Sequence, residues 1–210
     1  MNPNNLSFNS APSIENAENQ LEKNIRTLEQ INCSLDMKAT MVVVQLGVKP
    51  SATIDIYKHE EDVDSIKKKM ADAGLYFDDM EQAPFRNKYL AASLAIAKSQ
   101  EAATQLATLF RSERSDNNNI ELGKSLGYPA TSTEAYIGRR EKYERGLNPF
   151  VERRIPSNLQ FMLSKDKWEE ELQSGIAWIK ALKEASPETY QKMIEARSSE
   201  YDGVPLIVDY

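Results

Sequence analysis

Apolar residues near the start of the chain follow a helical spacing. Residues 1–12 are rich in Asn, Ser and Pro and are expected to be disordered, and Ser13 is a candidate N-cap. The apolar positions then recur every seven residues, at Ile14, Leu21, Leu28 and Leu35. This pattern predicts an N-terminal helix over residues 13–36. Two interpretations of the stripe stay open: the helix packs on its own core, or residues 13–35 form a homodimer seam or contact a protein partner.

Three segments of the region 40–112 have strand-like patterns. Residues 41–46 are apolar except for Gln45, which is typical of a buried strand. Residues 53–57 alternate between apolar and polar side chains, as a half-buried strand does. Residues 89–97 fit a helix because of their alanines and a strand because of their alternation, and we favour the strand.

Two helices are expected in the same region. Acidic side chains at positions 60–62 open the first, where the helix dipole favours them, and Gly74 is its natural stop. Ser99 is expected to cap the second. The residues that these helices should turn inward are apolar and helically spaced: Val63, Ile66, Met70, Ala103, Leu106, Ala107 and Phe110.

The rest of the chain, residues 115–200, looks almost entirely helical. One helix face collects Trp168 and the apolar residues that follow it at helical spacing, and Ser186 with Pro187 opens a last helix. The X-Pro steps at 148–149 and 155–156 predict an extended crossing between these helices, and residues 205–208 fit a terminal edge strand.

Strands in the first half and helices in the second predict an α+β fold. We expect one domain over residues 13–210, with a small sheet in the 40–112 part packed with helices.

Composition and charge narrow the function classes. The chain has 210 residues, a net charge of -6 and a pI of about 5.1, which makes nucleic acid an unlikely partner because phosphate binding needs a basic face. Neither a secretory signal nor a membrane-spanning apolar run is evident, so we expect a cytoplasmic protein. Cys33 is the single cysteine and is expected to be a small, unreactive helix residue.

The segment Gly127-Tyr128-Pro129 predicts a sharp corner between two helices. Gly127 suits the left-handed conformation that ends a helix, and Pro129 blocks its continuation. Thr131 and Glu134 have the spacing of a capping box that starts the next helix. We expect Tyr128 to pack over this corner.

This corner resembles the hallmark of an uncharacterised prokaryotic family, Leu-Gly-Tyr-Pro-x-Cys-Cys-x-x-x-Phe. The match rests on Leu126, Gly127, Tyr128 and Pro129, with Tyr136 in place of the phenylalanine, and a looser similarity covers residues 40–195. The similarity places the family's cysteine pairs on the following residues of this chain: Thr131 and Ser132, and a second pair near Ser164 and Trp168. Hydroxyl groups are poor ligands for zinc or iron–sulfur clusters, so the resemblance implies a scaffold that holds no metal and no cofactor there.

Basic residues outnumber acidic ones in residues 136–154, and Tyr136, Tyr143 and Phe150 are interleaved with them. Arginine beside aromatic rings can bind an anion, whereas the alternative is a solvated helix face with internal ion pairs. The candidate ligand-binding residues around the corner and this cluster are Tyr128, Thr131, Ser132, Glu134, Arg139, Arg140, Tyr143 and Arg145.

Two functional hypotheses follow. The first is a non-catalytic accessory or binding protein for a partner protein or an anionic small molecule. The second is a small metal-independent enzyme, whose carboxylate and hydroxyl groups would have to converge at the corner: Glu121, Thr131, Ser132, Glu134 and Arg139. His59, the only histidine, and the acidic pair Asp78-Asp79 are more simply explained as exposed residues near turns.

Overall fold

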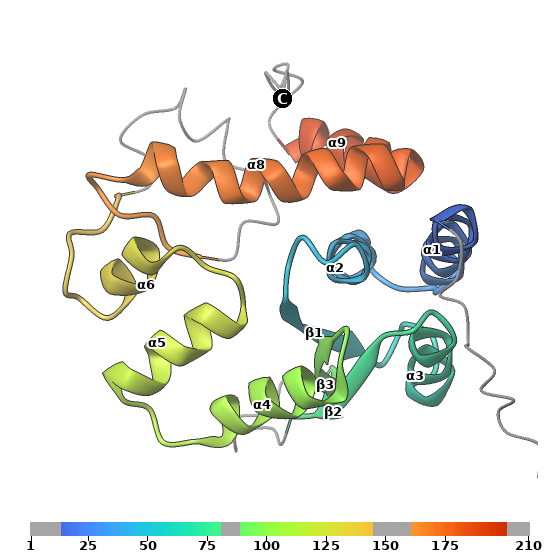
Figure 1. Cartoon of the computed structure of the whole chain (residues 1–210), viewed down its shortest axis with the longest axis horizontal. Helices are drawn as coiled ribbons and strands as arrows, with labels where there is room; N and C mark the ends of the chain where they lie inside the picture. The colour runs from blue at the N-terminus through green and yellow to red at the C-terminus, as the bar shows by residue number, and fades with distance from the viewer. Residues whose placement is uncertain (1–13, 81–88, 145–160, 201–210) are drawn as a thin grey trace, which may run out of the picture.

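The computed structural model describes residues 14–80, 89–144 and 161–200, and it confirms an α+β fold with a small sheet in the first half. There is one small antiparallel sheet, with some helices beside it and others stacked farther from it (Figure 1). The helices are α1 (Ile14–Glu29), α2 (Leu35–Gln45), α3 (Val63–Asp72), α4 (Gln100–Arg111), α5 (Asp116–Ser125), α6 (Ala130–Tyr136), α8 (Trp168–Ala185) and α9 (Pro187–Glu200). The strands are β1 (Ser51–Tyr57), β2 (Tyr76–Asp79) and β3 (Leu90–Ala97).

The sheet has the order β1-β3-β2, with β3 in the centre. The strands predicted over 53–57 and 89–97 are confirmed, and β3 pairs its Ala97 with Ser51 of β1 and with Tyr76 of β2. Strand β2 was not predicted. Its four residues include the acidic pair expected in a loop, and those carboxylates are neutralised by neighbours: Asp78 by Arg111 and Asp79 by Lys67.

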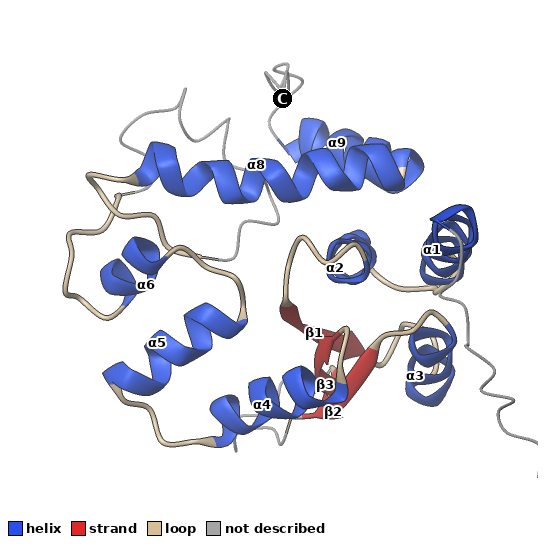
Figure 2. Ribbon diagram, in the orientation of Figure 1, coloured by secondary structure: helices blue, strands red, loops and turns tan. Residues whose placement is uncertain are grey.

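The strand predicted over 41–46 is wrong, because these residues belong to α2. This helix lies between the sheet and helices α8 and α9 (Figure 2), and Met41 to Gln45 are all buried. One face packs on the sheet and the other on α8 and α9. A helix that is buried all round loses the polar stripe that normally reveals it, so its β-branched run imitates a buried strand.

The predicted N-terminal helix is shorter than expected, and its stripe is used in the core. Helix α1 ends at Glu29, and Ser34 caps α2 by accepting a hydrogen bond from the N–H of Met37 at 3.3 Å. Cys33 therefore lies in the connecting turn and not in a helix. Leu28 is completely buried, and both Leu21 and Leu35 pack against the core.

The sheet separates two parts of the core. Side chains alternate between the two faces of β3. Leu94 and Ile96 pack on one face against α1, α2 and α3, and Ala95 packs on the other face against α4 and α5. Helices α8 and α9 cover α2 from the side away from the sheet (Figure 1). The predicted inner faces of α3 and α4 are confirmed except at Phe110, which is 38% exposed.

Some predictions fall outside the described residues: the disordered start, the proline crossing at 148–156, Phe150, Arg145 and the terminal strand over 205–208. Among the helices that the structure describes, none combines the length and the apolarity needed to cross a bilayer.

Candidate functional site

The Gly-Tyr-Pro corner joins α5 to α6 as the sequence predicts. Gly127 has a φ of 73°, and its N–H donates to the carbonyl of Lys124 at 3.0 Å. The N–H of Tyr128 reaches back to the carbonyl of Gly123 at 2.8 Å. These two bonds form a Schellman motif, which ends a helix by satisfying its last carbonyl groups and needs a left-handed residue at the position of Gly127.

The predicted capping box is wrong. Pro129 is the N-cap of α6, so Thr131 already lies inside the first turn and makes no cap. The carboxylate of Glu134 instead pairs with the guanidinium of Arg140 at 3.2 Å. Because proline lacks an N–H and its ring disfavours a helical turn before it, α6 begins directly after Pro129, before the hydroxyl that could have capped it.

Contacts from distant parts of the chain hold the corner in place. The hydroxyl of Ser51, at the start of β1, donates to the carbonyl of Ser125 at 2.5 Å. The hydroxyl of Ser132 donates to the carbonyl of Met162 at 2.5 Å. Gly127 lies so close to Pro50 that a Cβ on the glycine would meet the proline Cδ at 2.6 Å.

A cavity of about 200 Å³ lies beside the corner, which we call the corner cavity. Helices α4, α5 and α6 and the segment before α8 supply its walls, which are mostly apolar. Its lining residues are Phe110, Arg114, Asn119, Leu122, Gly123, Leu126, Tyr128, Ser132, Thr133, Tyr136, Phe161 and Met162. Phe110 and Tyr136 are respectively 38% and 47% exposed, so the cavity meets solvent beside these two rings.

Arg114 is the cationic group of the corner cavity. It is exposed, and its guanidinium donates to the phenol oxygen of Tyr136 at 3.1 Å. Within the part of the chain that the structure describes, no carboxylate pairs with it. A guanidinium has five N–H donors, so Arg114 keeps most of its hydrogen-bonding capacity for an anion.

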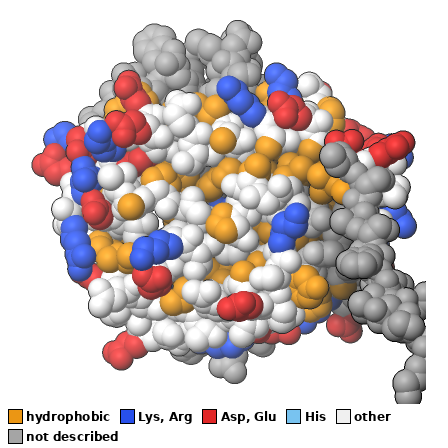
Figure 3. Space-filling view, in the orientation of Figure 1, with side chains coloured by type: hydrophobic (Ala, Val, Ile, Leu, Met, Phe, Trp, Pro, Cys, Tyr) orange, Lys and Arg blue, Asp and Glu red, His pale blue; other side chains and the backbone are white. Residues whose placement is uncertain are grey.

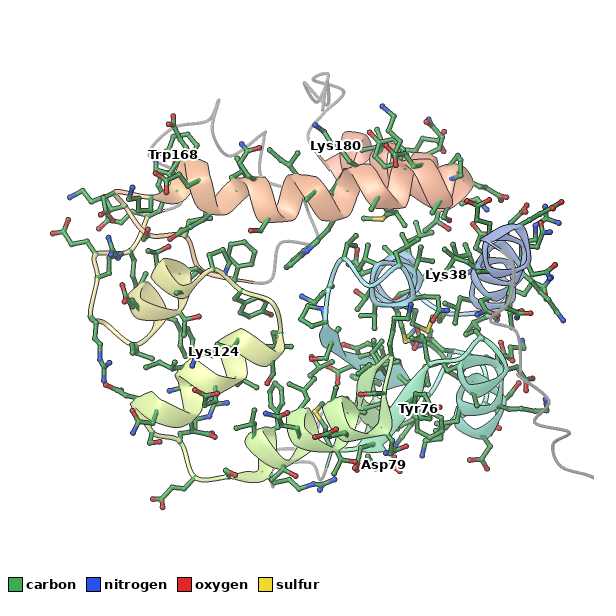
Figure 4. The ribbon with its side chains drawn as sticks, in the orientation of Figure 1. Lys38, Tyr76, Asp79, Lys124, Trp168 and Lys180 are labelled. Carbon is green, nitrogen blue, oxygen red and sulfur yellow. The ribbon has the colours of Figure 1, made fainter. Side chains whose placement is uncertain are left out.

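Only two of the predicted ligand-binding residues line the corner cavity, Tyr128 and Ser132. Thr131 is half-buried outside it. The ring of Tyr143 packs on Trp168, with 5.8 Å between the ring centres. Trp168 lies at the start of α8 (Figure 4). Arg145 lies outside the described residues.

The predicted arginine cluster is occupied by internal ion pairs. Arg139 pairs with Asp116 at 3.0 Å, and Arg140 contacts both Glu134 and Asp166. Over α5 and α6, at the left of the view, basic side chains lie interspersed with acidic ones (Figure 3). This arrangement matches the alternative of a solvated face with internal ion pairs.

The groups of the enzymatic hypothesis do not converge. Glu121 pairs with Lys124 at 2.7 Å, Glu134 and Arg139 are held by the partners already named, and Ser132 alone of the five lines the corner cavity.

The structure reveals a second unusual group that the sequence did not indicate. Lys49 is only 3% exposed, and its Nζ lies over two rings, 4.1 Å from the centre of Trp178 and 4.8 Å from that of Tyr128. Burial lowers the pKa of this amine to about 7, and it raises the pKa of the Tyr128 phenol to about 12. Lys49 lies between Val48 and Pro50 in a short loop, and nothing in this local sequence indicates that its side chain is buried.

The positions where the resemblance places the second cysteine pair have a structural use. The buried carboxylate of Glu171 accepts hydrogen bonds from the N–H and the hydroxyl of Ser164, both at 2.6 Å. Ser164 is fully buried and Glu171 is 2% exposed, so this bond pair fixes the segment before α8 that forms one wall of the corner cavity.

Replacing Glu171 with alanine is expected to lower the free energy of unfolding by about 2–3 kcal/mol, because two buried donors of Ser164 lose their acceptor. Urea denaturation measures the change. Glu170→Ala is the matched control: its exposed carboxylate pairs with Lys167 on the surface, and its loss should change stability by less than about 0.5 kcal/mol. Equal losses in both variants would contradict a structural role for the buried pair.

Within residues 14–80, 89–144 and 161–200, no three His, Cys, Asp or Glu side chains gather as a metal site would require. Comparison with protein-family models, curated proteins and solved structures yields no match to this chain. The resemblance to the Leu-Gly-Tyr-Pro family stays a prediction.

Proposed function

We propose that this protein is a binding protein for a small molecule with an apolar body and an anionic end, which it holds in the corner cavity. The observation that carries this proposal is an open, mostly apolar cavity with Arg114 on its wall and no carboxylate among the described residues to neutralise that arginine. A few convergent polar groups in an apolar pocket are the usual form of a ligand site.

The volume limits the ligand to a small one. A cavity of about 150 Å³ in a protein core is known to accept benzene, so about 200 Å³ suits one ring with a short substituent. Phe110, Tyr128 and Phe161 supply aromatic walls against which such a ring can stack.

The polar groups on the wall favour an anion over a cation. The hydroxyls of Ser132 and Thr133 already donate to backbone carbonyls, so they have no proton left for a ligand. The remaining side-chain donors of the lining are Arg114, the amide of Asn119 and the phenol O–H groups of Tyr128 and Tyr136, and Arg114 is the charged one among them. A carboxylate at the solvent end of the ligand would accept from Arg114 while its apolar body fills the interior.

Phenylacetate is a suitable probe, titrated into the full chain and followed by two-dimensional NMR. We expect shifts confined to residues of the corner cavity, and binding about tenfold weaker for the neutral analogue 2-phenylethanol. Arg114→Gln should remove this preference, because it replaces the guanidinium with an uncharged side chain.

Two variants separate the cavity from the arginine. Leu122→Trp should abolish binding of both probes, since the larger ring occupies the cavity, while the protein stays folded because Leu122 is partly exposed. Arg111→Gln is the matched charge control, as its guanidinium contacts Asp78 on the sheet and not the cavity. Shifts spread over the surface, or equal affinity for both probes, would refute the proposal.

The same proposal includes a cytoplasmic location. In its support, the chain has a single cysteine and so cannot form the intramolecular disulfides that are common in extracellular proteins.

A further inference from the structure

Lys49 points inward from a surface loop. Its neighbours Gly47, Val48 and Pro50 are exposed, whereas Lys49 itself is buried. Two hydrogen bonds fix the loop: the N–H of Lys49 donates to the carbonyl of Val43 at 3.3 Å, and the indole N–H of Trp178 donates to the carbonyl of Val48 at 3.2 Å. The side chain of Lys49 therefore points into the protein from a loop whose neighbouring residues are on the surface.

Aromatic rings surround the amine of Lys49. Trp178 and Tyr128 face the amine, and Phe161 contacts both rings, at 5.3 Å from Tyr128 and 5.8 Å from Trp178 between ring centres. Tyr128 and Phe161 also line the corner cavity, whereas Lys49 does not, so the surroundings of the amine share these two rings with the cavity.

The amine of Lys49 has no ionic partner in the part of the chain that the structure describes. Its contacts are the two ring faces, and neither a carboxylate nor a second cation lies near enough to affect its charge. Buried lysines are ordinarily paired, since an unpaired ammonium loses its hydration without replacement. The Tyr128 phenol is the titratable group that faces it, and its raised pKa keeps that phenol neutral.

We propose that Lys49 is a nucleophilic amine that captures a small aldehyde as a Schiff base. The Nζ lone pair attacks the carbonyl carbon, a C–N bond forms, and the oxygen takes up a proton. Loss of water then leaves a C=N bond, so no oxidant or reductant is needed. A protonated imine keeps a positive charge that the faces of Trp178 and Tyr128 stabilise as they do the ammonium.

The titration of this amine agrees with the proposed chemistry. With a pKa of about 7, about half of the amine is uncharged at pH 7, whereas an ordinary lysine with a pKa near 10.4 is uncharged in fewer than about one molecule in a thousand. Desolvated lysines are activated in this way in enzymes that form Schiff bases.

The test treats the full chain with propanal and sodium cyanoborohydride, which reduces each imine to a stable secondary amine. Peptide mass mapping then gives the initial labelling rate at each lysine from pH 6 to pH 9. The comparison residue is Lys180, which is exposed on the outer side of α8 (Figure 4). We expect Lys49 to react at least about tenfold faster than Lys180 at pH 7, and their ratio to fall as the pH rises toward 9.

Lys49→Met should remove the fast adduct while leaving labelling at Lys180 unchanged, and Lys49→Arg should do the same with the positive charge retained. If either variant fails to fold, the site-resolved rates of the unaltered chain still decide. Labelling of Lys49 no faster than that of Lys180, or a ratio that does not change with pH, would overturn the proposal. Failure of phenylacetate binding would not affect these rates, so the two proposals can fail separately.

Discussion

Replacing Gly127 with alanine is expected to lower the free energy of unfolding by about 2–4 kcal/mol. Two causes add. A side chain at φ 73° carries a conformational cost of about 1–2 kcal/mol, and its Cβ would lie 2.6 Å from the Cδ of Pro50, a distance that real Cβ atoms do not adopt. Thermal unfolding should shift by several degrees, since about 1 kcal/mol corresponds to about 2–4 °C in a chain of this size.

Gly138 provides the matched control for this substitution. It also follows a helix end, with a φ of 81° and the same pair of backbone hydrogen bonds, but a Cβ there would meet no atom within 4 Å. Gly138→Ala should therefore show the conformational cost alone. Pro50→Ala combined with Gly127→Ala removes the proline ring and should recover the difference. Equal losses in the two alanine variants would show that Pro50 does not press on the corner.

The local part of this corner could be predicted from sequence, whereas its packing could not. Gly127 and Pro129 carry their conformational preferences wherever they occur, so the turn and the left-handed glycine were predictable. The contact between Gly127 and Pro50 joins residues far apart in the chain and leaves no trace in either local pattern. The capping box was wrong because Pro129 starts α6 ahead of Thr131, a competition that spacing rules do not weigh.

The same distinction explains the fold. Alternation identified β1 and β3 because each has faces in different surroundings, with Ile54 and Ile56 of β1 turned toward α2. It failed for α2, whose Val42, Val43 and Val44 are enclosed on every side and so show no period at all.

The candidate site was predictable only in part for a similar reason. Tyr128 and Ser132 lie in or next to the Gly-Tyr-Pro segment, so the sequence pattern that predicts the corner also includes them. Phe110 and Arg114 reach the corner cavity from the end of α4 and the loop after it, and no local sequence pattern places this region beside the corner. The arginines at 139 and 140 were chosen for their charge, but charge alone does not show whether a carboxylate already neutralises it.

Lys49 is expected to make the stability of this protein rise with pH across the neutral to alkaline range. Its pKa is about 7 in the folded chain and 10.5 without burial, so between these values the unfolded chain binds more protons than the folded one. Deprotonation then favours folding by up to about 1.4 kcal/mol per pH unit. Below about pH 7 both states are protonated, and the full cost of burying the ammonium is present. Above about pH 10.5 neither state is protonated, and that cost is gone.

Lys49→Met isolates this effect from every other titration, because it keeps a long unbranched side chain among the rings and removes the charge. At pH 6.5 the variant should be more stable than the unaltered chain by about 2–4 kcal/mol, as expected when a buried, unpaired charge is replaced by an apolar group. Urea denaturation at pH 6.5 and pH 9.5 should show this advantage shrinking as the unaltered chain gains stability. Lys180→Met serves as the control, since an exposed side chain should give curves parallel to the unaltered chain at both pH values. Parallel curves for Lys49→Met as well would mean that the amine keeps its proton in the folded protein, with the faces of Trp178 and Tyr128 replacing the lost hydration.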